Sequence, residues 1–190
     1  QACLDHTFGG KITSCLVNPR ACHETELVIA PATKTKRIAV VGAGPAGLSF
    51  AVTAAERGHS VELFDSASEI GGQFNIAKKV PGKEEFFETL RYFDRQLKLR
   101  GVKLSLNTRV SADALKAAGF DEIVLATGVT PRTPDIDGVN HPKVMGYLDV
   151  LRDGKPVGKN VAVIGAGGIG FDVSEFLTHS GTSPSVDAPK

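Results

Sequence analysis

Three glycines, Gly42, Gly44 and Gly47, form the pattern Gly-x-Gly-x-x-Gly, whose spacing suits a phosphate-binding turn. The first glycine of such a pattern permits a tight turn, the second lets the backbone approach a pyrophosphate, and the third lets a helix pack close to a strand. The N-terminus of that helix offers unpaired N–H groups and a partial positive charge to the phosphates. Asp65 follows near the spacing of about 20 residues at which a carboxylate meets ribose hydroxyls. These residues predict an adenine-dinucleotide site.

The sequence on both sides of the glycines predicts the strands and the helix that must position this site. Residues 37–41 are a short β-branched run, which is typical of a buried parallel strand. Apolar residues at i, i+3, i+4 and i+7 predict a helix that contains Leu48, Ala51, Val52 and Ala55. Gly58 ends that helix, and residues 61–65 form a second strand that ends in the acid. We therefore expect a Rossmann-like α/β fold with a parallel sheet and flanking helices.

A second glycine pattern occurs near the end of the chain. The β run 160–164 opens onto residues 165–170, and residues 171–178 can form a helix. This pattern predicts the start of a second, NAD(P)-binding Rossmann-like domain, although a helix-packing turn without nucleotide is an open alternative. A complete βαβ unit takes about 30 residues or more, so the strand with the residue that separates NAD from NADP is expected outside the chain. Because the chain also opens on Gln1, we expect it to be truncated at both ends.

Two glycine-containing segments between these patterns suggest which dinucleotide binds first. Gly71 and Gly72 suit close backbone approach to a ligand, and residues 122–128 predict a strand that ends in an Ala-Thr-Gly turn. This pair resembles the two-dinucleotide-binding flavoproteins, in which both segments border FAD. The resemblance also implies main-chain contacts to adenine near Val110, after a strand at 102–106.

Residues 84–100 predict an amphipathic helix between these segments. Its apolar face contains Phe86, Leu90, Phe93 and Leu97. We assign these side chains to the core rather than to flavin stacking, because their helical spacing already accounts for them.

Cys3, Cys15 and Cys22 lie in the first 22 residues, and no cysteine follows them. Their odd number disfavours a disulfide framework, and their clustering indicates either a metal or iron–sulfur role or partly buried thiols. The surrounding residues bear on this choice. The segments 1–5 and 13–19 resemble the iron–sulfur segment of bacterial NADPH-dependent 2,4-dienoyl-CoA reductases and of the wider old yellow enzyme and trimethylamine dehydrogenase group.

The resemblance continues along the chain through residues 71–77, 80–86, 130–134 and 146–151. It implies that Cys3 and Cys15, with eleven residues between them, are two of four [4Fe–4S] ligands. The other two ligands are expected upstream, and Cys22 lies outside the pattern. The chain by itself is therefore not expected to hold a cluster.

The resemblance implies an electron relay from NADPH through FAD and a [4Fe–4S] cluster to FMN in an upstream TIM barrel of the same chain. There, an unsaturated fatty acyl-CoA would be reduced at its conjugated double bonds. The catalytic groups would belong to the barrel, so none is assigned here, and the five histidines are expected to be structural or exposed.

Three alternatives stay open. One is an amine dehydrogenase of the trimethylamine dehydrogenase type, with ADP in the second site. Another is the small subunit of glutamate synthase, which residues 73–77 disfavour. The third is a nucleotide-binding module without catalysis of its own.

Composition restricts the partners. A net charge of +1 and a charged fraction of 23% give no indication of nucleic acid or an anionic membrane. The apolar runs are too short to span a bilayer, so we expect a cytoplasmic protein. The expected segments are an iron–sulfur remnant and linker at 1–35, an incomplete FAD domain at 36–150, the start of the NAD(P)H domain at 151–180 and a flexible tail at 181–190.

The predicted binding residues are the following. FAD is expected to contact Gly42, Gly44, Pro45, Ala46, Gly47, Asp65, Gly72, Gln73, Val110, Ala126, Thr127 and Gly128. NADPH is expected to contact Gly165, Gly167, Gly168, Ile169 and Gly170.

Overall fold

The computed structural model describes residues 2–15 and 18–183, and these contain a four-stranded parallel sheet. Its order is β3-β2-β1-β4, with β1 at Arg37–Val41, β2 at Ser60–Phe64, β3 at Lys103–Ser105 and β4 at Glu122–Leu125. In β1, Val40 pairs with Leu63 of β2 and with Val124 of β4. The predicted α/β fold with a parallel sheet is therefore confirmed.

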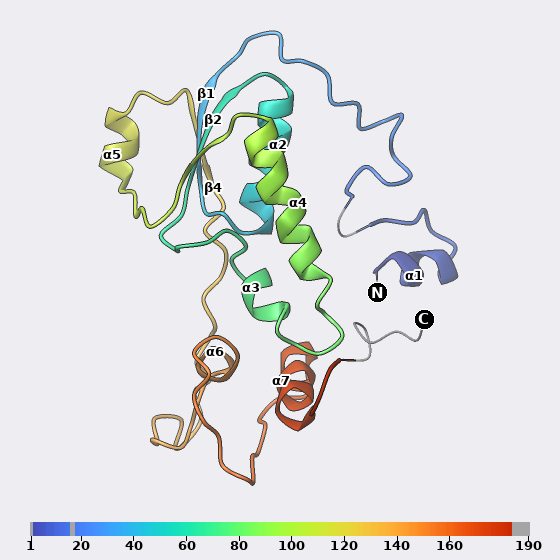
Figure 1. Cartoon of the computed structure of the whole chain (residues 1–190), viewed down its shortest axis with the longest axis vertical. Coiled ribbons are helices and arrows are strands. Elements are labelled where there is room, and N and C mark those ends of the chain that lie inside the picture. Colours follow the sequence, from blue (N-terminus) through green and yellow to red (C-terminus); the bar gives the residue numbers. More distant parts are fainter. Residues whose placement is uncertain (1, 16–17, 184–190) are drawn as a thin grey trace.

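Helices cover both faces of this sheet. Helices α2 (Pro45–Glu56) and α4 (Phe86–Leu99) lie on one face, and α5 (Ala112–Ala117) lies on the other (Figure 1). Side chains of a strand alternate between faces. Accordingly, Ile38 and Val40 pack with α2 and α4, whereas Ala39 packs with Leu115 of α5. The β-branched run of β1 is thus buried from both sides.

The apolar face predicted for residues 84–100 lies in the core. Leu90 and Leu97 of α4 are buried, and Phe93 packs against the same cluster. Phe86 stacks on Phe74 at 4.4 Å between ring centroids. These four side chains pack within the protein, as the helical spacing predicted.

The chain changes direction once within the sheet. From β1 it moves outward through α2 to β2 and through α4 to β3, then returns through α5 to β4 on the other side of β1. In open α/β sheets, ligands bind beyond the carboxyl ends of the strands where the strand order reverses. That point lies here between β1 and β4.

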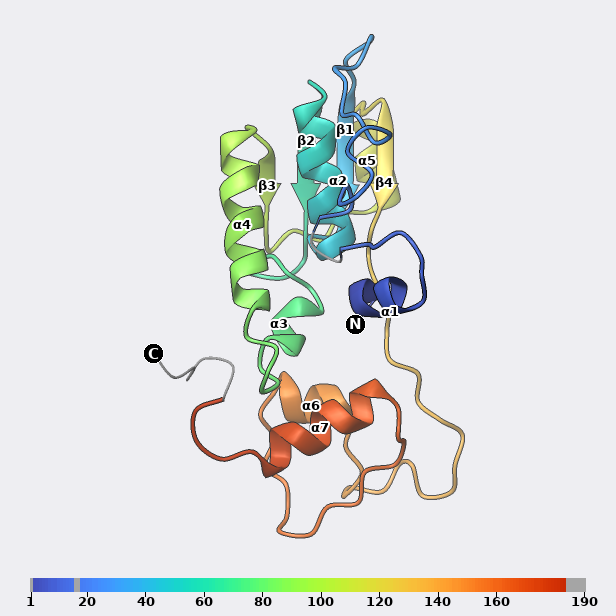
Figure 2. The same cartoon turned by 90° about the vertical axis from the view of Figure 1, so that its right-hand side faces the viewer.

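A smaller cluster lies beyond the carboxyl ends of the strands (Figure 2). It contains α3 (Phe74–Ala77), α6 (Tyr147–Leu151) and α7 (Gly168–Thr178). Val80, Leu151 and Val173 are buried together in it, and Ile76 packs against them. The segment that follows the flavoprotein-like Gly-Gly turn therefore touches both C-terminal helices.

The strand predicted at 160–164 does not form, and this prediction was wrong. A strand needs a neighbour for its backbone N–H and C=O groups, and none of the four described strands pairs with this segment. Its apolar side chains remain accessible, with Ile164 80% and Val161 48% exposed. The helix predicted after it is present as α7.

The N-terminal segment contains a short helix, α1 (Ala2–Phe8), followed by turns that lead to β1. At the other end, Ser183 is buried and its hydroxyl accepts a hydrogen bond from the Gly82 N–H at 3.0 Å. Most of the predicted flexible tail, residues 184–190, lies outside the described residues. Within residues 2–15 and 18–183, no helix combines the length and apolar character that crossing a membrane requires.

Replacing Leu48, which is fully buried in α2, tests this core. We expect Leu48→Ala to lower the free energy of unfolding by about 2–5 kcal/mol, because it removes buried methyl groups and leaves a cavity. Urea unfolding measures the change. Leu99→Ala is the matched control, since Leu99 is 60% exposed and its loss should cost within about 0.5 kcal/mol. Equal losses in both variants would contradict the assigned core.

Candidate dinucleotide-binding site

The first glycine turn is closed by contacts that leave no room for side chains. Gly42 has φ +108°, and a Cβ there would lie 2.2 Å from the Ala126 carbonyl oxygen. A Cβ on Gly47 would lie 1.8 Å from the Gly42 carbonyl oxygen. Glycine at both positions therefore lets α2 begin directly at the end of β1, with the segment after β4 against the turn.

Gly44 differs from these two because it faces open space. It is the N-cap of α2 with φ −77° and ψ −178°, a conformation that any residue adopts. Nothing lies within 4 Å of a Cβ built there. Pro45 has no N–H, so the donors of the first helical turn come from Ala46 and Gly47. A helix N-terminus next to open space suits a phosphate.

The Gly-Gly segment predicted from the sequence lies against the same turn. The Gly71 N–H donates to the Ala43 carbonyl at 2.8 Å. Gly72 has φ +51°, and a Cβ there would lie 3.1 Å from Gly44 Cα. The tertiary structure therefore brings three segments together, since Ala126 and Thr127 also approach Gly42.

Asp65, at the carboxyl end of β2, holds the first turn through hydrogen bonds to its carboxylate. One carboxylate oxygen accepts the Ala43 N–H at 2.6 Å, and the other accepts the Ala67 N–H at 2.8 Å. A carboxylate has about four lone-pair positions, so these bonds leave capacity for a further hydroxyl donor. The acid therefore connects the first turn to the carboxyl end of β2.

Three further predicted FAD residues have different surroundings. Val110 packs with Phe64 and Leu115 on the α5 side of the sheet. Gly128 has φ +75°, so the Ala-Thr-Gly turn ends in a conformation that favours glycine. Gln73 receives a long hydrogen bond of 3.5 Å from the Tyr147 hydroxyl of α6.

The second glycine turn repeats the geometry of the first. Gly165 has φ +120°, and a Cβ on Gly170 would lie 2.0 Å from the Gly165 carbonyl oxygen. Gly167 is the N-cap of α7, with φ −87° and ψ −178°. No atom lies within 4 Å of a Cβ on Gly167 or Gly168, and Ile169 is 55% exposed. The turn therefore has the same backbone geometry as the first turn although the preceding strand does not form.

The structure does not bring the cysteines into a metal site. Cys3, Cys15 and Cys22 carry thiols, and the Cys15 Sγ accepts the Asn18 N–H at 3.4 Å. Among the described residues, no three His, Cys, Asp or Glu side chains gather where they could hold a metal ion. Cys3 and Cys15 therefore supply at most two of the ligands that a [4Fe–4S] cluster needs.

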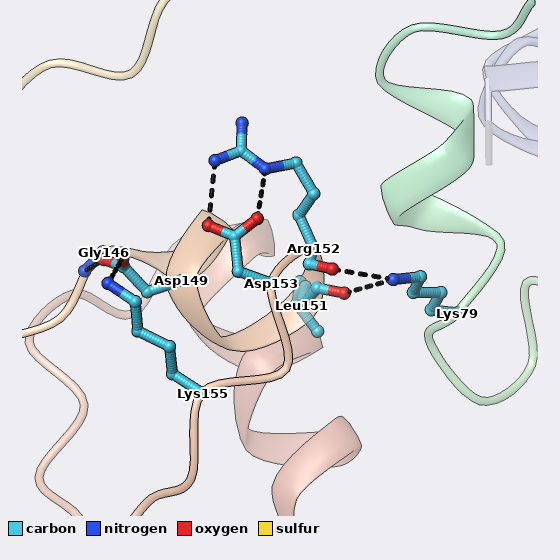
Figure 3. A network of polar contacts seen from close by, with 7 residues as sticks. All are labelled: Lys79, Gly146, Asp149, Leu151, Arg152, Asp153 and Lys155. Carbon is cyan, nitrogen blue, oxygen red and sulfur yellow. Dashed lines mark hydrogen bonds and ion pairs between the residues drawn. The ribbon is translucent and has the colours of Figure 1, made fainter. Parts of the chain in front are cut away.

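Sequence reasoning missed the contacts that join α6 to the segment after α3. The Lys79 ammonium donates to the carbonyls of Leu151 and Arg152 at 2.9 and 3.1 Å (Figure 3). No motif marks Lys79, because a lysine that binds helix-end carbonyls has the same sequence appearance as a solvated one. Only the three-dimensional fold shows its partners.

Helix α6 also carries two local ion pairs (Figure 3). Lys155 and the Gly146 N–H both donate to Asp149, and they hold the pKa of that carboxyl below its ordinary value. The Arg152 guanidinium likewise lowers the pKa of Asp153 through two hydrogen bonds. Asp149 lies within α6 and caps its start through the Gly146 N–H, whereas Arg152 and Asp153 follow the last residue of the helix.

Most of the chain matches a known protein family. Residues 36–186 match the model of the pyridine nucleotide-disulphide oxidoreductase family. The chain belongs to this family. Domains of the family bind FAD and NAD(P)H, so the two matched turns occur in an oxidoreductase domain of known type.

Several curated relatives match nearly the whole chain. It is 37% identical over 186 residues to a metal reductase of Desulforamulus reducens, covering 96% of this chain and 28% of the relative. It is 33% identical to a bilirubin reductase of Mediterraneibacter gnavus, covering 98% of this chain and 29% of the relative. The chain thus spans less than a third of these relatives.

Solved structures show the same arrangement. A complex of 2-naphthoyl-CoA reductase with 2-naphthoyl-CoA aligns with a TM-score of 0.89 at 37% identity, covering 93% of this chain and 27% of that one. A 6-hydroxypseudooxynicotine amine oxidase from Pseudomonas geniculata aligns with a TM-score of 0.72 at 29% identity, covering 80% and 25%. Both a 2-naphthoyl-CoA reductase and an amine oxidase therefore contain a region with this fold.

The contact between Gly47 and Gly42 gives a direct test of the turn. We expect Gly47→Ala to destabilise the chain by about 1–3 kcal/mol, because the added methyl group overlaps backbone that cannot move aside. Urea unfolding measures the loss. Gly158→Ala is the control, since the nearest atom to its Cβ is 3.9 Å away, and its effect should stay within about 0.5 kcal/mol. A Gly47→Ala variant as stable as the control would show that the turn is not closed as described.

Proposed function

We propose that this chain binds FAD on its first turn and NAD(P)H on its second, and that it passes reducing equivalents from the nicotinamide to the flavin. The observation that carries the proposal is that both turns share one geometry, in which a glycine N-cap faces open space at the start of a helix. The family to which the chain belongs supports the same pair of ligands.

The first turn fits an adenine dinucleotide in three respects. The open side of Gly44 leaves room for a pyrophosphate, and the N-terminus of α2 would stabilise its charge. Gly72 lies next to Gly44 and would border the same ligand. Asp65 would accept a ribose hydroxyl with its remaining lone pairs while holding Ala43 in place. The remaining proposed FAD contacts are Pro45, Ala46, Gln73, Val110, Ala126, Thr127 and Gly128.

The second turn would hold NAD(P)H in the equivalent way. The residues around the N-terminus of α7 would face the pyrophosphate of NAD(P)H. They are Gly165, Gly167, Gly168, Ile169 and Gly170. When bound, FAD supplies the chemistry of accepting a hydride from a reduced nicotinamide. The residues of this chain contribute binding and orientation, and no side chain of it is assigned as an acid or base.

For the whole protein we propose reduction of a conjugated double bond in an acyl-CoA, as in the 2,4-dienoyl-CoA reductases that the sequence resembles. The structural similarity to 2-naphthoyl-CoA reductase supports an acyl-CoA substrate. FMN in an upstream TIM barrel and a [4Fe–4S] cluster with Cys3 and Cys15 as ligands belong to this wider proposal. Because the described residues do not complete a cluster site, no step of the proposed chemistry in this chain passes through one.

Amine oxidation is the second candidate function. It rests on the similarity to the 6-hydroxypseudooxynicotine amine oxidase and to a relative described as a probable N-methylproline demethylase from Rhizobium meliloti, at 32% identity. In that case electrons would enter at the substrate rather than at the second turn. NAD(P)H would then have no role, and the second turn would hold a nucleotide as a static ligand.

Matched glycine substitutions test the two nucleotide sites separately. We expect Gly44→Ala to weaken FAD binding at least about tenfold, because its methyl group would occupy the space of the pyrophosphate without disturbing the fold. Gly167→Ala should instead weaken NAD(P)H binding to a similar extent and leave FAD binding unchanged. Titration calorimetry with FAD, FMN, NADH and NADPH measures both. The assignment is wrong if Gly44→Ala binds FAD as tightly as the unaltered protein.

The direction of electron flow distinguishes the two candidate functions. Under anaerobic conditions, we expect NADPH or NADH to bleach the flavin absorbance of the natural full-length protein, and a dienoyl-CoA or aryl-CoA to restore it. Small methylated amines should leave the oxidised flavin unchanged. Bleaching by an amine, with no response to either nicotinamide nucleotide, would favour the amine dehydrogenase function instead.

A further inference from the structure

Residues 79–83, called here the docking turn, connect the two nucleotide turns physically. They follow α3, which begins directly after Gly72 and Gln73 of the first site. They also contact both α6 and α7, and α7 carries the second glycine turn at its N-terminus. Neither the glycine patterns nor the proposed function assigns a role to this segment.

The docking turn has a defined backbone. The Lys83 N–H donates to the Val80 carbonyl at 3.0 Å, with Pro81 and Gly82 between them. Gly82 has φ +82°, which is the conformation that a type II turn requires at its third residue, and Pro81 suits the second. The turn therefore presents Val80 and Lys83 in one conformation.

Three side chains of the turn, Lys79, Val80 and Lys83, contact the C-terminal helices α6 and α7. Val80 is 2% exposed and packs with Leu151 of α6 and Val173 of α7. Lys79 donates to the last carbonyls of α6, which is the end of a helix where a cation is favourable (Figure 3).

Lys83 binds both carboxylate oxygens of Asp172, each at 2.6 Å. Asp172 lies in α7 close to its N-terminal glycine turn. The Lys83 contact therefore ties the docking turn to the helix of the second site.

The ionic contacts of the turn suit orientation more than stability. The Lys83 and Asp172 side chains are 40% and 27% exposed, and partly exposed ion pairs contribute little to the free energy of folding. Their geometry, however, restrains how α7 can rotate about the buried Val80. Hydride transfer requires the reacting atoms to be held about 3–3.5 Å apart. A small rotation of the second site would change this separation and so lower the rate of hydride transfer.

We propose that Lys79 and Lys83 are positioning residues, which set the orientation of the second nucleotide site relative to the first and so determine the rate of flavin reduction. This inference rests on the proposed function. It adds that the segment leaving the flavin turn itself governs the approach of the nicotinamide.

The test is stopped-flow reduction of the flavin in the natural full-length protein by NADH or NADPH. We expect Lys83→Met and Lys79→Met each to lower the limiting rate constant roughly 10- to 100-fold. The dissociation constant for the nucleotide and the FAD content should stay within about twofold of the unaltered protein, because neither glycine turn is changed. This division between rate and binding is what a merely structural role would not produce.

Two further variants test whether the loss of rate comes from the Lys83–Asp172 ion pair. The double variant K83D/D172K restores an ion pair at the same place and should recover most of the rate lost in Lys83→Met. Lys98→Met removes an exposed i,i+4 pair with Asp94 on α4 and should leave every constant unchanged.

The failures are distinguishable. If the unaltered protein is reduced and both lysine variants are reduced equally fast, the positioning role is wrong while the proposed function stands. The role is also wrong if the rate falls only in proportion to lost FAD. If neither nucleotide reduces the unaltered protein, the proposed function is wrong and this inference fails with it.

Discussion

The close approach of Gly47 to the Gly42 carbonyl is the constraint on which the first site depends. A Cβ at Gly47 would lie 1.8 Å from that oxygen, so only glycine lets α2 begin immediately after β1. This approach places the N-terminus of α2 at the carboxyl edge of the sheet. The open face of Gly44 then lies beside the helix end that favours an anion.

The topology of the sheet completes the site around that turn. The chain returns from β3 to β4 on the other side of β1, and the residues after β4 therefore press against Gly42. Asp65 at the end of β2 accepts the Ala43 N–H from one side, and Gly71 donates to the Ala43 carbonyl from another. Both backbone groups of Ala43 are thus hydrogen-bonded to segments that are distant in sequence, which restrains the conformation of the turn.

The second turn shows which part of this arrangement is local. Gly165 and Gly170 repeat the close contact of the first turn at 2.0 Å, and among the described residues no strand directly precedes them. The turn conformation therefore does not require a paired strand before it. What it lacks is the enclosure that Ala126 and Gly72 provide at the first turn, so the two turns are equal in backbone geometry but unequal in surroundings.

The sequence by itself determined the parallel α/β class, the strands β1 and β2, the helices around them and both glycine turns. These follow from local periodicity and from residue types that only certain backbone conformations allow. The tertiary structure alone decided that residues 160–164 form no strand, because strand formation depends on a neighbour and not on β-branched composition. It also decided that Asp65 braces Ala43, and that Lys79 and Lys83 bind α6 and α7. Those partners lie far apart in the chain, and no spacing rule relates a lysine to the carbonyl or carboxylate that the fold brings to it.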